Sequence, residues 1–446
     1  MIILKISEII SYTNGKVKLK TYKDKEIKKI RIDSRLVEKG DLFVAIKGEQ
    51  NNGHQFVKDA LKKGAVAVII SDTIRGIKDE MLIKVENTDI ALLTIAHHYK
   101  SQFKIPFIAI TGSVGKTTTK ELLALILSTK YNVLKNEKNY NNGYGVPLTL
   151  FNLSKEHEIG VIEMGMNHMK EISVLSNCVN PNTAIITNIG TSHIGYLKSK
   201  KNILKAKMEI IDGMNSNGTL FVNGDDDLLE KITPDIKVVN CGFHKNNDFE
   251  AFDVISDLYL STFSLEHNHK VYEIEVNLPG HLLTNVLLAI RVGLEYGVKI
   301  EDIVSVLKTY RSKNMRMNIE LLKNKITLID DSYNCSFESL RGILKILEQL
   351  DDDKLLILGE IRELGNQSKK IHKSLKEHIV NVIKRELILV GPAMKNIKIS
   401  GAKYFDDYQQ VIEHLKTLNI SDKLILVKAS RGVELDKVCD YLRNQN

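Results

Sequence analysis

The sequence predicts an α/β protein of three domains, and three observations support this class. Its 446 residues are about three times the length of a typical domain. Hydrophobic residues make up 43% of the chain and charged residues 26%, which is typical of proteins with buried cores. Short apolar segments alternate with helical patterns along most of the chain, an order typical of parallel sheets covered by helices. We therefore expect domains at residues 1–84, 85–313 and 314–446.

The first predicted domain is a small mixed α/β unit. Its helix should end at Gly64, because glycine tolerates the left-handed backbone of a helix C-terminus. A buried strand follows directly in AVAVII. The expected elements are strands in KEIKKIRIDSR (25–35), DLFVAIKG (41–48) and AVAVII (65–70), and a helix in HQFVKDALKKG (54–64).

The two larger predicted domains repeat the order strand then helix. We expect a central, doubly wound parallel sheet and a smaller, Rossmann-like C-terminal sheet, because parallel strands need the crossovers that helices supply. An alternating stretch at 249–278 instead predicts a hairpin. The expected central strands lie at 107–110, 159–164, 183–190 and 218–223, and the C-terminal ones at 326–334, 354–361, 386–391 and 422–432.

Composition argues against several classes of protein. No apolar run approaches the roughly 18 residues of a membrane-spanning helix, and the first residues do not resemble a secretion signal. The four cysteines lie far apart without a CxxC pair, which indicates a cytoplasmic protein without a zinc or redox motif. The net charge of +8 suits anionic substrates, but we find no dense basic patch of the kind that binds nucleic acid.

The strongest local motif is TGSVGKTTTKE at 111–121, between a predicted strand and a predicted helix. Gly112 and Gly115 let the backbone curl so that its N–H groups point at phosphate oxygens. Lys116 can then reach terminal phosphates, and the Thr117 hydroxyl can ligate magnesium. The motif is shorter than GxxxxGK[ST], since position 110 is Ile, and the alternative is a glycine turn with a chance lysine. The flanking strand and helix favour a phosphate loop.

Glu163 and His193 are expected beside this loop. Each follows a predicted strand, and open parallel sheets bind ligands at the carboxyl ends of their strands. Glu163 can hold magnesium directly or through water, and its alternative is a surface or helix-capping role. His193 is the weaker candidate, because magnesium prefers oxygen ligands and histidines are common in loops.

Lys207 lies on the apolar side of a predicted helix, KNILKAKMEII at 201–211. One interpretation is that its stem covers apolar surface while the ammonium group reaches water. The other is that burial lowers its pKa and leaves a neutral amine that captures carbon dioxide; the carbamate would then ligate magnesium. Its neighbours three and four positions away are Ile203, Leu204, Ile210 and Ile211.

Two further patterns are interpreted as ordinary local structure. His267-Asn268-His269 has the letters of a nuclease motif, but it falls at the expected tip of the hairpin and should be a turn. NNGYG at 141–145 lacks the third spaced glycine of a dinucleotide-binding fingerprint and should be a loop.

Sequence motifs occur in order along nearly the whole chain. They are DSR (33–35), GDLFVAIKG with NNGHQF (40–57), TGSVGKTTTKE (111–121), NYNNGYGVPLTL (139–150), IEMGMNH (162–168), the His193 loop, AKMEI (206–210), HLLTN (281–285), DDSYN (330–334), LGEIRELG (358–365) and KASRG (428–432). Together they resemble the motifs of one family, the ATP-dependent Mur ligases of bacterial cell-wall synthesis. Within that family, DDSYN and LGEIRELG favour the member that joins D-Ala-D-Ala to UDP-N-acetylmuramoyl-tripeptide.

The resemblance implies a reaction and its setting. ATP would phosphorylate the terminal carboxylate of the UDP-linked tripeptide, and the amine of D-Ala-D-Ala would attack the acyl phosphate. It implies a monomeric enzyme of the bacterial cytoplasm that uses ATP and Mg2+, takes these two small-molecule substrates, and neither binds nucleic acid nor inserts into membranes.

The resemblance also assigns residues to roles. Lys116, Glu163, His193 and Lys207 would be catalytic, Lys207 as a carbamate. The implied ATP-binding residues are Gly112, Ser113, Val114, Gly115, Lys116, Thr117, Thr118, His281, Asn285, Arg316 and Asp331. The implied metal ligands are Thr117, Glu163, His193 and Lys207. The implied substrate-binding residues are Asp33, Ser34, Arg35, His54, Asn139 and Asn142.

Two alternatives stay open from the sequence. A neighbouring member of the family adds a diamino acid to the dipeptide precursor. A phosphate-loop ATPase that moves or binds macromolecules would instead hydrolyse ATP without either substrate. The sequence leaves the third residue of the tripeptide open, as well as the use of D-Ala-D-Ser or D-Ala-D-Lac.

Overall fold

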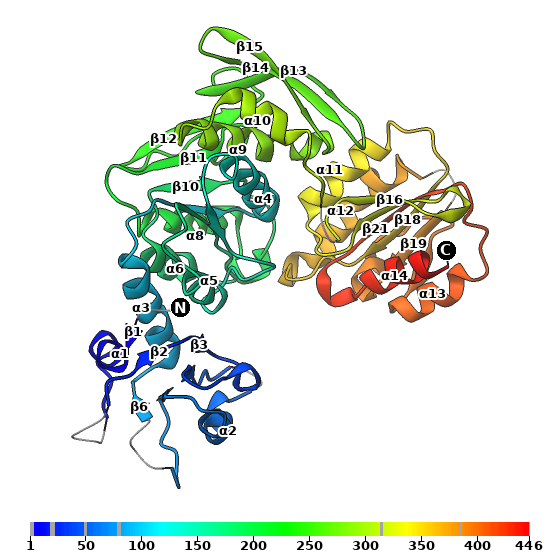
Figure 1. Ribbon diagram of the computed structural model, residues 1–446. Helices are drawn as coiled ribbons and strands as arrows, with labels where there is room; N and C mark the ends of the chain where they lie inside the picture. Colours follow the sequence, from blue (N-terminus) through cyan, green and yellow to red (C-terminus); the bar gives the residue numbers. More distant parts are fainter. Residues whose placement is uncertain are drawn as a thin grey trace.

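The computed structural model describes residues 4–17, 23–48, 51–77, 82–312, 315–383 and 386–445. Three larger sheets, each flanked by helices, follow one another along the chain, and a two-stranded sheet accompanies the first (Figure 1). This arrangement confirms the predicted three-part α/β fold. The expected boundary at 313–314 falls outside the described residues, and the domain boundaries stay predictions. Within the described part, no helix is long and apolar enough to cross a membrane.

The first sheet has four parallel strands in the order β3-β4-β5-β6. The prediction of one strand at 25–35 was wrong, because the chain bends there: Ile27 and Ile30 are both buried, a spacing that one strand cannot place on a single face. The N-terminal elements are β1 (Leu4–Lys5), α1 (Ile6–Thr13), β2 (Glu26–Ile27), β3 (Ile30–Arg31), β4 (Leu42–Val44), α2 (Val57–Lys62), β5 (Ala67–Ile70), β6 (Leu82–Lys84) and α3 (Thr88–Ser101). β1 pairs with β2 apart from the first sheet, and α3 leads to the central part (Figure 1).

The central sheet has nine strands in the order β15-β14-β13-β12-β11-β10-β7-β9-β8. Its strands from β8 to β13 pair in parallel, and α4, α9 and α10 pack together on the face opposite α5 and α6 (Figure 1). The strands are β7 (Phe107–Thr111), β8 (Val133–Lys135), β9 (Ile159–Glu163), β10 (Thr183–Ile186), β11 (Thr219–Asn223), β12 (Lys237–Gly242), β13 (Phe249–Ser256), β14 (Ser261–His267) and β15 (Lys270–Val276). The helices are α4 (Lys116–Leu127), α5 (Gly145–Leu150), α6 (Glu171–Val179), α7 (Ile194–Leu197), α8 (Lys200–Met208), α9 (Leu283–Glu295) and α10 (Ile300–Leu307).

The position of β7 explains where a ligand can bind. After β7 the chain forms β8 at the edge and β9 between them on one side, and then crosses to β10, β11 and β12 on the other side of β7. Such a reversal of strand order opens a crevice beyond the carboxyl ends of the strands. The segments after β7, β9 and β10 therefore meet at one edge, and these are the segments that carry the phosphate-loop motif, Glu163 and His193.

The hairpin expected at 249–278 is confirmed. β14 and β15 pair without a slip from Ser261 opposite Val276 to His267 opposite Lys270. Asn268 and His269 form the tip with φ of +50° and +62°, the backbone of a tight two-residue hairpin turn. The interpretation of His267-Asn268-His269 as a turn is therefore confirmed.

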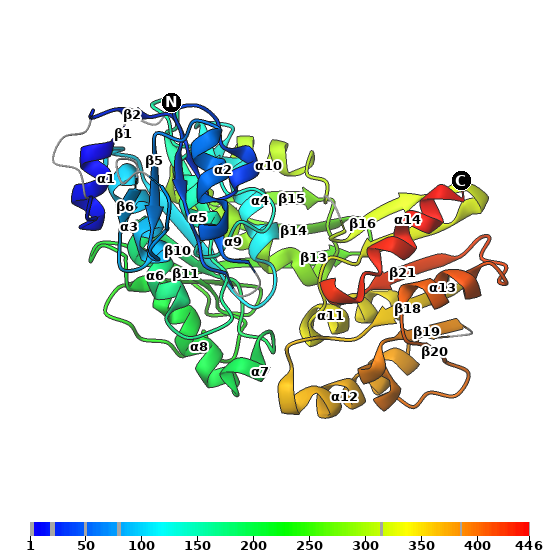
Figure 2. The ribbon, with the colours of Figure 1, turned by 90° about the horizontal axis from the view of Figure 1, so that it is seen from below.

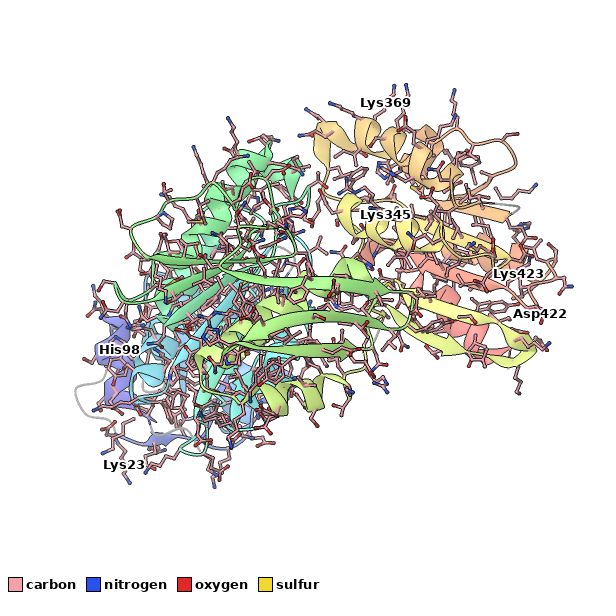
Figure 3. All side chains as sticks on the ribbon, turned by 90° about the horizontal axis from the view of Figure 1, so that it is seen from above. Lys23, His98, Lys345, Lys369, Asp422 and Lys423 are labelled. Atoms are coloured by element: carbon pink, nitrogen blue, oxygen red, sulfur yellow. The ribbon has the colours of Figure 1, made fainter. Side chains whose placement is uncertain are left out.

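The C-terminal sheet has six strands in the order β16-β17-β21-β18-β19-β20, parallel except for β16. α11 and α12 cover one face, and α13 and α14 cover the other (Figure 2). Lys345 of α11 and Lys369 of α12, both labelled in Figure 3, are exposed. The elements are β16 (Asn318–Leu321), β17 (Thr327–Asp331), α11 (Phe337–Leu347), β18 (Lys354–Gly359), α12 (Ser368–Val380), β19 (Glu386–Val390), β20 (Lys403–Phe405), α13 (Tyr408–Leu415), β21 (Leu424–Lys428) and α14 (Asp436–Asn444).

Buried cysteines are part of these cores. Cys178, Cys241, Cys335 and Cys439 are all buried and form no disulfide. Burial raises the pKa of each thiol, so none is activated as a nucleophile.

Gly160→Ala should destabilise the central sheet. Gly160 of β9 lies opposite Phe107 of β7, and a Cβ at 160 would come within 2.5 Å of the phenyl ring. Overpacking of this kind costs about 1–3 kcal/mol, so we expect a lower midpoint in urea unfolding followed by circular dichroism. Gly143→Ala is the matched control, because a Cβ there meets nothing within 4 Å. Equal midpoints for the two variants would contradict this packing.

Candidate active site

The phosphate-loop motif forms a tight turn between β7 and α4. Gly112 and Gly115 have φ of +152° and +85°, which favour glycine. A Cβ on Gly112 would lie 1.8 Å from Thr187 Oγ1, and one on Gly115 would lie 2.3 Å from Asn285 Oδ1. Both glycines are therefore required by the backbone and by close neighbours.

The segment after β10 holds this loop in place. The Ser113 N–H donates to the Asn188 carbonyl at 3.0 Å, and the Val114 N–H donates to Asn188 Oδ1 at 2.8 Å. These two amides are thus engaged within the chain. The first amides of α4, which have no partner inside the helix, are the groups left to face a phosphate.

Lys116 folds back onto the loop. Its Nζ donates to the Gly112 carbonyl at 2.6 Å, and burial lowers its pKa while the carboxylate of Glu163 opposes that shift. A phosphate oxygen would take over the position of this carbonyl as the lysine's partner.

Glu163 ends β9 and is only 2% exposed. Its Oε2 accepts from the Thr117 hydroxyl at 2.9 Å, and its Oε1 accepts from Asn141 Nδ2 at 2.8 Å. Lys120 Nζ lies 3.7 Å from the same carboxylate. The backbone N–H and carbonyl of Glu163 are both bonded to the Asn136 amide. This burial contradicts a surface role for Glu163, and the structure brings it together with Thr117 as predicted.

His193 lies between β10 and α7 with a φ of +63°. Its Nδ1 is 2.6 Å from Glu363 Oε2, although the ring N–H is not aligned for a hydrogen bond. Burial lowers the pKa of His193, and Glu363 opposes that shift. His193 is also within electrostatic range of Lys116 and Lys207, so all three lie around one site.

Lys207 is fully buried in α8, and its Nζ has no hydrogen-bond partner among the described residues. Burial lowers its pKa well below the usual value, and the charge of Lys116 adds to the effect. Glu209 is held elsewhere, because its carboxylate accepts from the Lys170 and Ser173 amides. The interpretation that Lys207 reaches water is therefore wrong.

The oxygen donors of this site suit a magnesium ion better than a metal whose ligands all come from protein side chains. Over the described ranges, no three His, Cys, Asp or Glu side chains converge to hold a metal. Magnesium usually keeps several waters and phosphate oxygens and takes only one or two protein oxygens. The Thr117 hydroxyl beside the Glu163 carboxylate matches that requirement.

His281 and Asn285 lie at the start of α9. Asn285 Oδ1 accepts from Thr119 Oγ1 at 3.3 Å and lies against Gly115, so it reaches the phosphate loop. The His281 ring packs against Gly342 of α11, because a Cβ added to Gly342 would lie only 2.9 Å from that ring. Burial, with a smaller effect of Lys428, lowers the pKa of His281 to about 3, which keeps the imidazole neutral.

Arg316 and Asp331 have different environments. The Arg316 guanidinium lies 4.0 Å from the Tyr333 ring centroid and is within electrostatic range of Lys116. Asp331 is 9% exposed and is held by Lys428 Nζ and the Met317 N–H. The neighbouring Asp330, rather than Asp331, lines the cleft described next.

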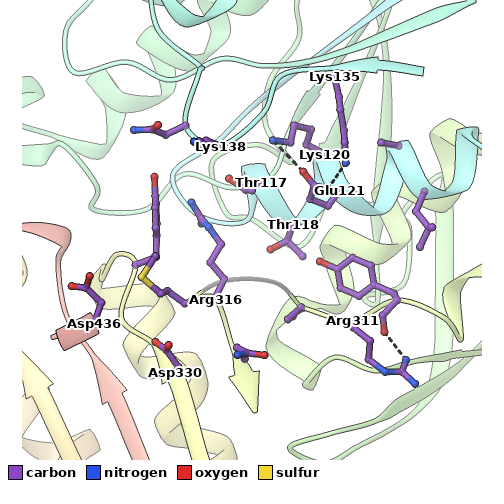
Figure 4. A pocket seen from close by; sticks show the side chains of 18 of the residues that line it. Thr117, Thr118, Lys120, Glu121, Lys135, Lys138, Arg311, Arg316, Asp330 and Asp436 are labelled. Atoms are coloured by element: carbon purple, nitrogen blue, oxygen red, sulfur yellow. Dashed lines mark hydrogen bonds and ion pairs between the residues drawn. The ribbon is translucent and has the colours of Figure 1, made fainter. Parts of the chain in front are cut away.

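A cleft of about 1200 Å³ separates the central and C-terminal parts (Figure 4). Arg316 and Asp330 face Thr117 and Thr118 across it. Its lining also includes Lys120, Glu121, Lys135, Lys138, Asn139, Tyr310, Arg311, Tyr333, Arg431 and Asp436. Such a cleft has room for a nucleotide and a peptide.

The predicted N-terminal residues have different local contacts, and their role in substrate binding stays a prediction. Asp33 pairs with the Arg35 guanidinium, which holds the pKa of that carboxyl to about 2. Ser34 and Arg35 line a surface hollow with Lys62 and Lys63.

His54 and Asn142 are engaged elsewhere. His54 Nε2 accepts from the Ser71 and Asp72 amides, and its Nδ1 lies 2.7 Å from Asn52 Oδ1. Asn142 Oδ1 accepts from two amides at the start of α5. Both side chains thus stabilise a local turn, and their roles in substrate binding stay predictions.

Matches to known proteins cover nearly the whole chain. Three family models match, described as Mur ligase family, catalytic domain (residues 26–99), Mur ligase middle domain (110–293) and Mur ligase, glutamate ligase domain (315–431). The UDP-N-acetylmuramoyl-tripeptide–D-alanyl-D-alanine ligase of Bacillus subtilis is 31% identical over 97% of each chain. The chain belongs to the Mur ligase family. It is therefore an ATP-dependent ligase that forms peptide bonds.

Solved structures are similar to this Mur ligase along its full length. A crystal structure of MurF from Acinetobacter baumannii superposes with a TM-score of 0.92 at 29% identity and covers 100% of both chains. A structure of MurF from Thermotoga maritima in complex with ADP has a TM-score of 0.84 at 27% identity and covers 94% of this chain and 97% of that one.

Three residues of this Mur ligase site were missed from the sequence. Asn141 and Lys120 contact Glu163, and Glu363 contacts His193. All three stand inside the motifs that carry the family resemblance. Their place in these motifs indicated a role in the site, but the motifs alone do not show which side chains they contact.

Proposed function

We propose that this Mur ligase joins D-Ala-D-Ala to UDP-N-acetylmuramoyl-tripeptide with ATP, giving the pentapeptide precursor of peptidoglycan. The similarity over 97% of the chain to an enzyme named for that reaction carries the proposal. The similarity extends through the C-terminal part, where the incoming amine would bind. The cleft beside the phosphate loop supplies the room for both substrates.

The chemistry starts from a carboxylate, which is a poor electrophile. Transfer of the γ-phosphoryl group of ATP to a carboxylate oxygen gives an acyl phosphate and ADP. The amine of D-Ala-D-Ala then attacks the acyl carbon, phosphate leaves with the C–O bond electrons, and the nitrogen loses a proton. The protein contributes mainly positioning and charge stabilisation. Lys116 and the first amides of α4 would hold the phosphates.

Magnesium ions would be held by Thr117, Glu163, His193 and modified Lys207. When bound, magnesium neutralises charge on the phosphate oxygens during transfer. The Thr117–Glu163 pair supports this assignment, because a half-buried hydroxyl and a buried carboxylate lie 2.9 Å apart beside the phosphate loop.

Lys207 would carry a carbamate. A neutral amine attacks carbon dioxide and loses a proton, which leaves an anion with two oxygens. The buried Nζ without a partner and the lowered pKa of Lys207 both favour the neutral amine that must react first.

The remaining ligand contacts follow the placement of the side chains. ATP would contact Gly112, Gly115, Thr118, His281, Asn285 and Arg316. The hollow beside Ser34 and Arg35, with Lys62 and Lys63, suits the diphosphate of the UDP-linked substrate. Asn139, which lines the cleft, would contact the peptide end. The enzyme would act as a monomer in the bacterial cytoplasm, as the family resemblance implies.

ADP release should depend on both substrates. UDP-N-acetylmuramoyl-tripeptide with D-Ala-D-Ala should give rapid ADP release, and omission of the dipeptide should reduce the rate at least about 100-fold, because no amine can then complete turnover. A coupled ADP assay measures this. Activity only with a diamino acid and the dipeptide precursor would assign the neighbouring reaction of the family. Equal ATP hydrolysis without either substrate would indicate an ATPase of another purpose.

A further inference from the structure

The segment that carries His193 is docked onto the C-terminal part of the chain. The Gly195 N–H donates to the Glu363 carbonyl at 2.8 Å, and Gln367 Nε2 donates to the Lys198 carbonyl at 3.0 Å. We call residues 193–198 and 363–367 together the latch. The latch joins the short helix α7, with its two capping residues, to the segment after β18.

Two glycines let the latch close. A Cβ on Gly195 would lie 2.5 Å from the Glu363 carbonyl oxygen, and one on Gly365 would lie 2.9 Å from Gly195 Cα. The two backbones therefore touch without intervening side chains. This close approach fixes where the side chain of Glu363 enters the central site.

Glu363 enters beside the imidazole of His193. Its Oε2 lies 2.6 Å from Nδ1, which leaves Nε2 as the nitrogen that can face a ligand. A carboxylate that accepts from one ring nitrogen fixes the orientation of a metal-binding imidazole and raises its basicity. Glu363 is close enough for this contact, and a small rotation of the His193 ring would align Nδ1–H with its carboxylate. Glu363 also lies within electrostatic range of Lys116, so it borders the phosphate site.

We propose that Glu363 is a positioning residue that couples closure of the latch to assembly of the metal site. Glu363 comes from the C-terminal part, so it reaches His193 only when that part is docked. Its carboxylate then selects Nε2 of His193 as the metal-facing nitrogen. By linkage, metal binding favours the docked arrangement to the same degree. The inference rests on the proposed role of His193 as a magnesium ligand.

The test uses the full-length enzyme with Mn2+ as a paramagnetic probe and a non-hydrolysable ATP analogue. Glu363→Ala should weaken Mn2+ binding about 10- to 100-fold in electron paramagnetic resonance titrations, and Glu363→Gln should weaken it less. His193→Ala should weaken binding similarly, and the double variant should lose little more, because both changes remove one interaction. Gln367→Ala is the matched control, since it removes a latch contact that does not touch His193.

The possible outcomes separate this inference from the proposed function. Wild-type affinity in both Glu363 variants would overturn it. Gln367→Ala loosens the latch without touching His193, so it should weaken Mn2+ binding less than Glu363→Ala does. An equal loss in the two variants would overturn the positioning role of the Glu363 carboxylate. Thermal melting checks that each variant is folded, and Glu363→Gln serves as the decisive variant where Glu363→Ala does not fold. A preference for a different amine substrate would change the proposed function and leave these Mn2+ results untouched.

Discussion

Replacement of Lys207 by alanine should abolish ligation, with a fall in kcat of about 10³-fold or more. The change removes the carbamate oxygens that would hold magnesium against the phosphates, and charge stabilisation of this kind is a large part of phosphoryl transfer. The side chain is fully buried, so no neighbouring surface group can take its place. The measurement is ADP release with both substrates in bicarbonate buffer.

Lys205 supplies the matched control for Lys207. It lies two residues earlier on the same helix but is exposed, so Lys205→Ala should keep nearly full activity. Short carboxylic acids such as acetate should partly restore the Lys207→Ala variant, because they can enter the vacated space and supply oxygens. Full activity of Lys207→Ala without added acid would contradict the carbamate.

Glu163→Gln should lower kcat about 10²- to 10³-fold and raise the magnesium concentration needed for half-maximal activity. The amide keeps the shape of the side chain and can still bond Thr117 and Asn141, so the fold should survive. What the variant loses is the negative charge that would hold the cation. Initial rates measured over a magnesium titration separate the fall in kcat from the weaker magnesium binding, because the first lowers the plateau and the second shifts the midpoint.

Glu158 lies just before the same strand, at the end away from the phosphate loop. Its carboxylate accepts from the Asn132 N–H at 2.8 Å, and a glutamine can keep that contact. Glu158→Gln should therefore leave the magnesium dependence unchanged. Identical titration curves for wild type and Glu163→Gln would show that Glu163 is not a ligand.

Local sequence patterns were enough to predict several parts of the site. The strand, glycine turn and helix around Lys116 are contiguous, so their spacing already fixes the phosphate loop. Lys207 was placed on the buried side of α8 by helical periodicity alone. Glu163 and His193 were placed at one edge because parallel strands share the direction of their carboxyl ends.

Contacts between distant segments could not be predicted in the same way. The pair His193 and Glu363 joins residues 170 positions apart, across two sheets. Among Asn139, Asn141 and Asn142, only the packing of the loop decides that Asn141 bonds Glu163 while Asn142 caps α5. Along β17 side chains alternate between faces, which places Asp330 rather than Asp331 at the cleft.

The fixed carboxylate of Glu163 has a consequence for cation size. Both carboxylate oxygens already accept hydrogen bonds, and the side-chain amide of Asn136 bonds the backbone N–H and carbonyl of Glu163. Calcium is accommodated by side chains that can spread and bind through two oxygens at longer range, whereas magnesium demands short, nearly octahedral bonds. In the proposed site, a carboxylate with so little freedom to rotate would offer a single, well-placed oxygen, and this rigidity would favour the smaller ion.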